Sequence, residues 1–182
     1  GCARAATPEG WSGGVVTNQA LFIGTMEGDI RALSTSTGDI LWSFEFVGES
    51  DDGDKALYGT PVIADNILYF GGYNGVLYAM ATDGLDVWET RVGDGAHIVG
   101  GPVVDDDKLF VGSGDGNMYA LSVSDGSILW SFPTGDKIWS TPVVEDGIVY
   151  FGSLDHNVYA LNSGDGSLVW RFVADGAVTG KP

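Results

Sequence analysis

The chain repeats itself about every 40 residues, and few architectures accommodate a period of that length. Each of four aligned segments contains four short apolar motifs. In the last segment these motifs are S-T-P-V-V, V-Y-F-G, V-Y-A-L and L-V-W-R-F. A glycine closes the second motif and a tryptophan stands in the fourth. The closing glycines are Gly24, Gly71, Gly112 and Gly152, and the tryptophans are Trp42, Trp88, Trp130 and Trp170.

Each motif predicts a β-strand, because it is short, rich in alternating or β-branched apolar residues, and without a helical period. Asp-Gly pairs such as Asp125-Gly126 separate the motifs. Both residues tolerate positive φ, which makes the pair a strong hairpin signal. Four antiparallel strands in each repeat predict an all-β fold, a β-propeller with four four-stranded blades and the start of a fifth. We expect the blades at residues 11–57, 58–98, 99–138 and 139–178, with the fifth beginning at 179–182 and a tether at 1–10.

The repeated tryptophans are predicted to pack between adjacent blades. A single blade has two apolar faces, so it needs neighbours on both sides. Burying one indole removes roughly 150–250 Å² from water. A structural role is therefore favoured over a cofactor-binding role for these residues. The residues assigned to this docking are Trp42, Trp88, Trp130 and Trp170, with the turn glycines Gly38, Gly84, Gly126 and Gly166.

Composition excludes several functional classes. The chain has 25 acidic and 8 basic residues, a formal charge of −17, which argues against nucleic acid as a partner. The one cysteine, Cys2, can form neither an internal disulfide nor a thiolate metal cage. No stretch has the spacing of an EF-hand, so no metal site is predicted. The two histidines stand in unrelated loops, so no catalytic Ser–His–Asp set is predicted either.

Two stretches, residues 119–130 and 159–170, resemble the tryptophan-docking motif of the PQQ-type (quinoprotein-like) β-propeller repeats. The resemblance covers nearly all the chain after residue 10, and it implies a fold more than a function. Enzymes of this family bind pyrroloquinoline quinone with calcium and carry a catalytic Asp and an adjacent cysteine pair. This chain has no cysteine pair, so no cofactor is predicted. The repeats also resemble non-catalytic members, including the lipoprotein propeller of the outer-membrane barrel-assembly machine.

The two ends of the chain add two predictions. Cys2 stands in a context that resembles the end of a bacterial lipobox, which predicts an exported lipoprotein anchored in the cell envelope; the alternative is a chance cysteine. Residues 179–182 repeat the opening of an inner strand. They predict that the chain is the N-terminal half of a longer propeller, and the alternative is that two copies close one ring.

Inner strands line the channel of a propeller, so the residues that open them are the candidate binding residues. The aromatic residues at this position, Trp11, Tyr58 and Trp139, are the candidates, together with His97 and Lys137, which precede two of the strands; the same position holds Val99 and Thr179 in the other repeats. The aromatic residues could stack on a flat ligand or grip a peptide, or simply pack against neighbouring strands. The acidic loop at 49–54 is either a contact for a basic partner or a solvated insertion.

Together these features predict a non-catalytic, extracytoplasmic propeller scaffold that binds other proteins, among them components of envelope protein assembly. Contact with the membrane is expected only through the lipid anchor. Two alternatives stay open. One is a fragment of a dehydrogenase that depends on pyrroloquinoline quinone and calcium, and the other is a ligand-sensing propeller.

Overall fold

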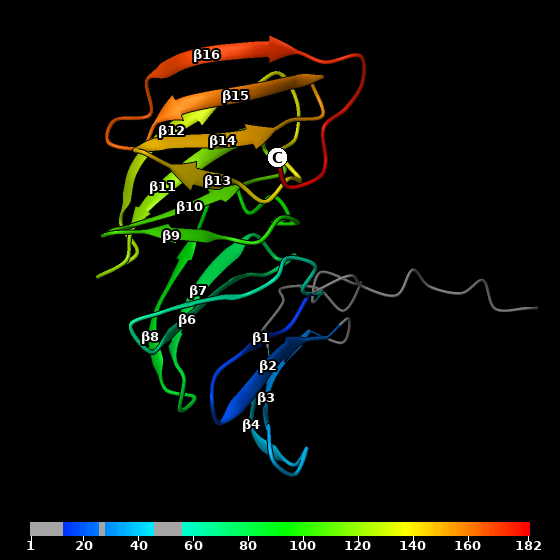
Figure 1. Cartoon of the computed structure of the whole chain (residues 1–182), viewed down its shortest axis with the longest axis vertical. Coiled ribbons are helices and arrows are strands. Elements are labelled where there is room, and N and C mark those ends of the chain that lie inside the picture. The colour runs from blue at the N-terminus through cyan, green and yellow to red at the C-terminus, as the bar shows by residue number, and fades with distance from the viewer. Residues whose placement is uncertain (1–12, 26–27, 46–55) are drawn as a thin grey trace, which may run out of the picture.

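Sixteen β-strands make up all the regular structure in this computed structural model, which describes residues 13–25, 28–45 and 56–182. They form four antiparallel sheets, and each sheet takes four strands in chain order. The sheets follow one another from the blue first sheet to the orange and red fourth sheet (Figure 1). The predicted all-β class and the four-stranded antiparallel blades are confirmed.

The first sheet contains β1 (Val15–Val16), β2 (Ala20–Gly24), β3 (Asp29–Ser34) and β4 (Ile40–Glu45). The second contains β5 (Val62–Ala64), β6 (Ile67–Gly71), β7 (Val76–Ala81) and β8 (Asp86–Arg91). The third contains β9 (Val103–Asp105), β10 (Lys108–Gly112), β11 (Asn117–Ser122) and β12 (Ile128–Pro133). The fourth contains β13 (Val143–Glu145), β14 (Ile148–Gly152), β15 (Asn157–Asn162) and β16 (Leu168–Val173). Residues 179–182 form no strand, and neither do their equivalents at 139–142.

The same row of three residues crosses each sheet. In the third sheet Phe110 pairs with Ala120, and Ala120 pairs with Trp130. Because alanine is small, the two aromatic side chains meet over it, with ring centroids 5.8 Å apart. The register shifts just after this alanine, between Ala120 and Leu121, and such a bulge increases the twist of the outer strand. The other three sheets repeat the shift and the aromatic pair.

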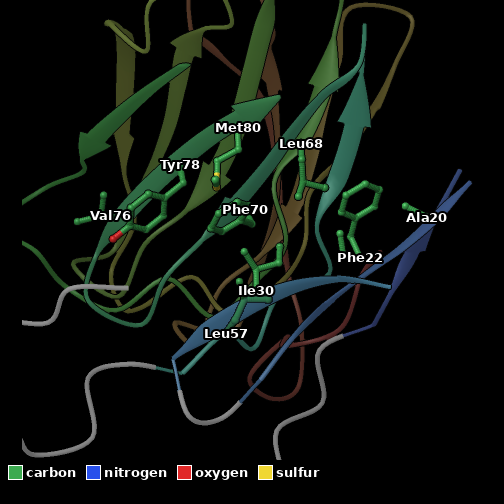
Figure 2. Packing of buried hydrophobic residues seen from close by; sticks show 10 residues of the cluster. Ala20, Phe22, Ile30, Leu57, Leu68, Phe70, Val76, Tyr78 and Met80 are labelled. Carbon is green, nitrogen blue, oxygen red and sulfur yellow. The ribbon is translucent and has the colours of Figure 1, made fainter. Parts of the chain in front are cut away.

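The core lies between successive sheets. Phe22 and Ile30 of the first sheet face Leu68, Phe70 and Met80 of the second (Figure 2), and all five are fully buried. Two further clusters fill the spaces between the second and third sheets and between the third and fourth. Each sheet is therefore stabilised chiefly by burial of apolar area against its neighbours.

Three of the repeated tryptophans dock on the following sheet through the same hydrogen bond. The indole N–H groups of Trp42, Trp88 and Trp130 donate to the carbonyls of Thr82, Val123 and Ser163 at 3.1, 2.9 and 3.1 Å. The glycine beneath each indole belongs to that next sheet: Gly84 for Trp42, Gly126 for Trp88 and Gly166 for Trp130.

The two outermost members of the docking set are placed differently. Trp170, on the outer strand of the fourth sheet, is 44% exposed. At Gly38 a Cβ would have no described atom within 4 Å. An indole therefore docks on the turn glycine of the following repeat. Trp170 and Gly38 have no such partner among the described residues.

A half-buried aspartate of the fourth sheet, Asp155, binds both a tyrosine of its own sheet and the loop that leaves the third sheet. The Tyr159 hydroxyl donates to Asp155 Oδ2 at 2.6 Å, and the Gly135 N–H donates to the same oxygen at 2.8 Å. Burial raises the pKa of Asp155, but hydrogen bonds from Tyr159, Gly135 and Asn157 outweigh this and hold it below its usual value. Burial and the neighbouring carboxylate raise the pKa of Tyr159 to about 12, so its hydroxyl remains a donor.

This arrangement predicts a contribution of Asp155 to acid sensitivity. Because the folded-state pKa of Asp155 is lowered, its stabilisation is present above the unfolded pKa of about 3.9 and is lost as pH falls through the lower, folded value. The variant Asp155→Asn should therefore lose stability at pH 7 and lose less at pH 2.5. Urea unfolding of both proteins at the two pH values measures this, and an equal loss at both would contradict it.

Candidate functional site

Three buried apolar side chains fix the loops that enter the second, third and fourth sheets. Leu57, Ile98 and Ile138 are almost completely buried. Each packs on the glycine that ends the second strand of the preceding sheet. A Cβ at Gly71, for example, would overlap the Ile98 side chain. The repeated glycine therefore serves close approach of the next loop.

Five neighbours of these anchors point away from the core, because an extended backbone places successive side chains on opposite sides. Tyr58 follows Leu57, His97 and Val99 flank Ile98, and Lys137 and Trp139 flank Ile138. These flanking side chains are half-buried or exposed. They converge with Tyr73, which lies in the turn between β6 and β7.

Two adjoining cavities result, and we call them together the mouth groove. One has a volume of about 220 Å³ and is lined by Tyr58, Tyr73, Val99 and Trp139. The other has a volume of about 260 Å³ and is lined by Tyr73, Ala96, His97, Val99, Gly114, Lys137 and Trp139. They share the walls formed by Tyr73, Val99 and Trp139.

Contacts among its own residues hold the mouth groove in shape. The Tyr73 and His97 rings stack, with their centroids 3.7 Å apart and their planes within 2° of parallel. The ring centroid of Tyr58 lies 5.1 Å from that of Tyr73. His97 Nδ1 lies 2.6 Å from the Tyr73 carbonyl oxygen. A carbonyl only accepts, so Nδ1 carries the proton and Nε2 is the acceptor of the neutral ring. Lys137 Nζ lies over the Trp139 ring, 5.9 Å from its centroid.

The tight packing of inner-strand entries leaves little room for other side chains beside the mouth groove. A Cβ at Gly59 would lie 2.6 Å from the Gly100 carbonyl oxygen, and one at Gly101 would lie 2.5 Å from that of Thr60. The Gly101 N–H donates to Thr141 Oγ1 of the next sheet at 2.9 Å. The entries of the second, third and fourth sheets therefore meet backbone to backbone, which sets the spacing of the aromatic residues above them.

Comparison with known proteins identifies the family of the chain. The family model of the outer membrane protein assembly factor BamB matches residues 3–99 and 74–180. The chain belongs to the BamB family. The predicted resemblance to PQQ-type repeats is thereby confirmed. The comparison with curated proteins finds no match.

A solved BamB structure supports the fold. The crystal structure of BamB from Moraxella catarrhalis matches with a TM-score of 0.81 and 24% sequence identity. The match covers 94% of this chain and 52% of that chain, so this chain spans about half the length of that BamB. At this identity the likeness concerns the propeller fold.

In this BamB-family chain, the structure brings four of the predicted mouth residues together: Tyr58, His97, Lys137 and Trp139. Trp11, Cys2 and the acidic loop at 49–54 lie outside the described residues. Sequence analysis did not single out Tyr73. Its equivalents in the third and fourth sheets are Gly114 and Leu154. The sequence signal that could have indicated Tyr73 is an aromatic residue at this turn position.

In the part of the chain that the structure describes, no three His, Cys, Asp or Glu side chains gather closely enough to hold a metal ion. Among residues 13–25, 28–45 and 56–182, no helix has the length and apolar character needed to cross a bilayer.

Proposed function

We propose that this chain is a non-catalytic, extracytoplasmic scaffold that binds other proteins during assembly of outer membrane proteins. The observation that carries the proposal is the mouth groove, in which Tyr58, Tyr73 and Trp139 are partly accessible on a rigid frame. Tyrosine and tryptophan are enriched at protein interfaces and dominate their binding energy. The family description, an outer membrane protein assembly factor, supplies the setting.

The division of the mouth groove into two compartments suits inserted side chains. Its two cavities have volumes of about 220 and 260 Å³ and share three lining residues. A partner protein can insert one side chain into each. Because the two volumes together fall within the roughly 300–1,000 Å³ typical of small-molecule sites, it is the family description, and not the volume, that favours a protein partner.

We also propose that Cys2 carries a lipid and anchors the protein to an envelope membrane. A tethered propeller would present its mouth groove to membrane-associated partners. Mass spectrometry of the native protein tests the anchor, because a diacylated Cys2 adds the mass of its acyl chains. An unmodified Cys2 in protein released without detergent would overturn this part of the proposal.

Photo-crosslinking tests the binding face. A benzoylphenylalanine replacing Tyr58 in the mouth groove should crosslink to outer-membrane assembly proteins in intact cells. The same residue replacing Ile128, which is exposed on β12, should not. Crosslinks of equal yield from both positions, or from Ile128 alone, would show that the mouth groove is not the binding face.

The variant Trp139→Ala gives a quantitative version of this test. Trp139 is 39% exposed, so its removal should leave the fold intact while removing a wall of both cavities. We expect the affinity for the crosslinked partner to fall about tenfold or more, the loss typical of a central interface aromatic residue. Unchanged affinity, with an unchanged unfolding curve, would contradict the proposal.

A further inference from the structure

The mouth groove differs in charge from the chain around it. The protein has 25 acidic residues, yet none of the described residues that line the two cavities is acidic. Lys137 and His97 line one of them. No ion pair joins Lys137 to another described residue, and its ammonium group lies over Trp139. A cation is therefore available at this position to pair with a negative group of a partner.

The two cavities also differ from each other. The cavity at Tyr58 is lined only by three aromatic residues and Val99. The cavity at Lys137 contains both basic side chains. Since the two cavities share Tyr73, Val99 and Trp139, an apolar compartment lies directly beside a cationic one. A ligand that fills both must carry an apolar group next to an anionic group.

We propose that the mouth groove binds a peptide segment in which an aromatic side chain stands next to a carboxylate side chain. The aromatic side chain packs against Tyr58, Tyr73 and Trp139, where tilted and stacked ring pairs are favoured. The carboxylate pairs with the Lys137 ammonium group. This inference rests on the proposed function and specifies the partner chemistry of the same site.

His97 supplies a further contact. Its Nδ1–H donates to the Tyr73 carbonyl, and its ring stacks on Tyr73, so the orientation of the imidazole is fixed. The other ring nitrogen, Nε2, bonds to no described residue. In the neutral ring it is an acceptor, and it can take a backbone N–H of the bound segment.

Three capped tetrapeptides test the proposal by isothermal titration calorimetry with the full chain. They are acetyl-Gly-Phe-Asp-Gly-amide, the neutral analogue with Asn in place of Asp, and the analogue with Ala in place of Phe. The Phe-Asp peptide should bind about two- to fivefold more tightly than the Phe-Asn peptide, the range of an exposed ion pair. It should bind about tenfold more tightly than the Ala-Asp peptide.

Two variants assign these preferences to residues. Lys137→Met keeps the apolar stem and removes the charge, so it should bind the Phe-Asp and Phe-Asn peptides equally. Trp139→Ala should weaken both peptides together. Raising the salt concentration from 0.05 to about 0.5 M should narrow the preference of the wild type, because the charges are screened. Melting curves of the variants are the control, and each is expected to match the wild type.

The inference is overturned if the wild type binds the Phe-Asp and Phe-Asn peptides equally, if the preference survives in Lys137→Met, or if neither aromatic peptide binds. If Tyr58 still crosslinks to assembly proteins, such a result rejects only the stated ligand chemistry. If Tyr58 does not crosslink to them, the proposed function itself is rejected.

Discussion

Replacing Trp130 with alanine should lower the free energy of unfolding by about 3–5 kcal/mol. The indole packs against Phe110 with ring centroids 5.8 Å apart and donates a hydrogen bond to the Ser163 carbonyl at 3.1 Å. It also lies directly on Gly166, where a Cβ would be 2.7 Å from Trp130 Cε3. The substitution removes all three contacts and leaves a cavity between the third and fourth sheets. Equilibrium unfolding in urea measures the loss.

The matched control is Trp170→Ala in the same 182-residue chain. Trp170 has the same position in its sheet, and its ring neighbour Tyr150 is the equivalent of Phe110, with ring centroids 5.8 Å apart. It is 44% exposed, however, and its indole N–H donates to no described residue. The cost should be about 1 kcal/mol or less, because little buried area is lost. Equal losses for the two variants would show that docking on the next sheet contributes nothing.

The second large effect is expected at Gly126. This residue has φ of +70°, where alanine costs roughly 1–2 kcal/mol more than glycine. In addition, a Cβ there would lie 2.5 Å from Trp88 Cε3 and from Thr90 Oγ1. Overpacking of this kind adds about 1–3 kcal/mol. The variant Gly126→Ala should therefore be destabilised by about 2–5 kcal/mol.

The variant Gly38→Ala distinguishes the destabilisation due to backbone conformation from that due to overlap with a docked tryptophan. Its φ is +77°, close to that of Gly126, but a Cβ there would meet no described atom within 4 Å. Gly38→Ala should lose only the backbone contribution, about 1–2 kcal/mol. Thermal or urea unfolding of the two variants gives the difference directly. If Gly38→Ala is as destabilising as Gly126→Ala, the turn glycines serve conformation alone.

The strands and turns could be predicted from the sequence because their causes are local. Alternating apolar residues, Asp-Gly turns and a period of about 40 residues recur four times, and each copy supports the others. The glycine that closes the second motif marked the end of a strand. Its further role, making room for Ile98 or Ile138 of the next loop, depends on two sheets lying together and has no local signature.

The candidate site could likewise be predicted only in part from the sequence. The openings of the inner strands predicted that Tyr58 and Trp139 lie near one another, since inner strands share the channel. Tyr73 could not be predicted, because it enters the mouth groove from the turn between β6 and β7, and its equivalents are Gly114 and Leu154. Its stacking on His97 joins two loops whose meeting depends on how the sheets are stacked.

The sequence by itself therefore determined the strands, the turns, the repeat and the propeller class, since period-two patterns and turn residues act over a few positions. The tertiary structure alone decided that Trp42, Trp88 and Trp130 each dock on the glycine of the next repeat. It also decided that an aromatic cavity lies beside the cation of Lys137. The physical reason is that both depend on the twist and packing of whole sheets, which bring together residues about 40 positions apart.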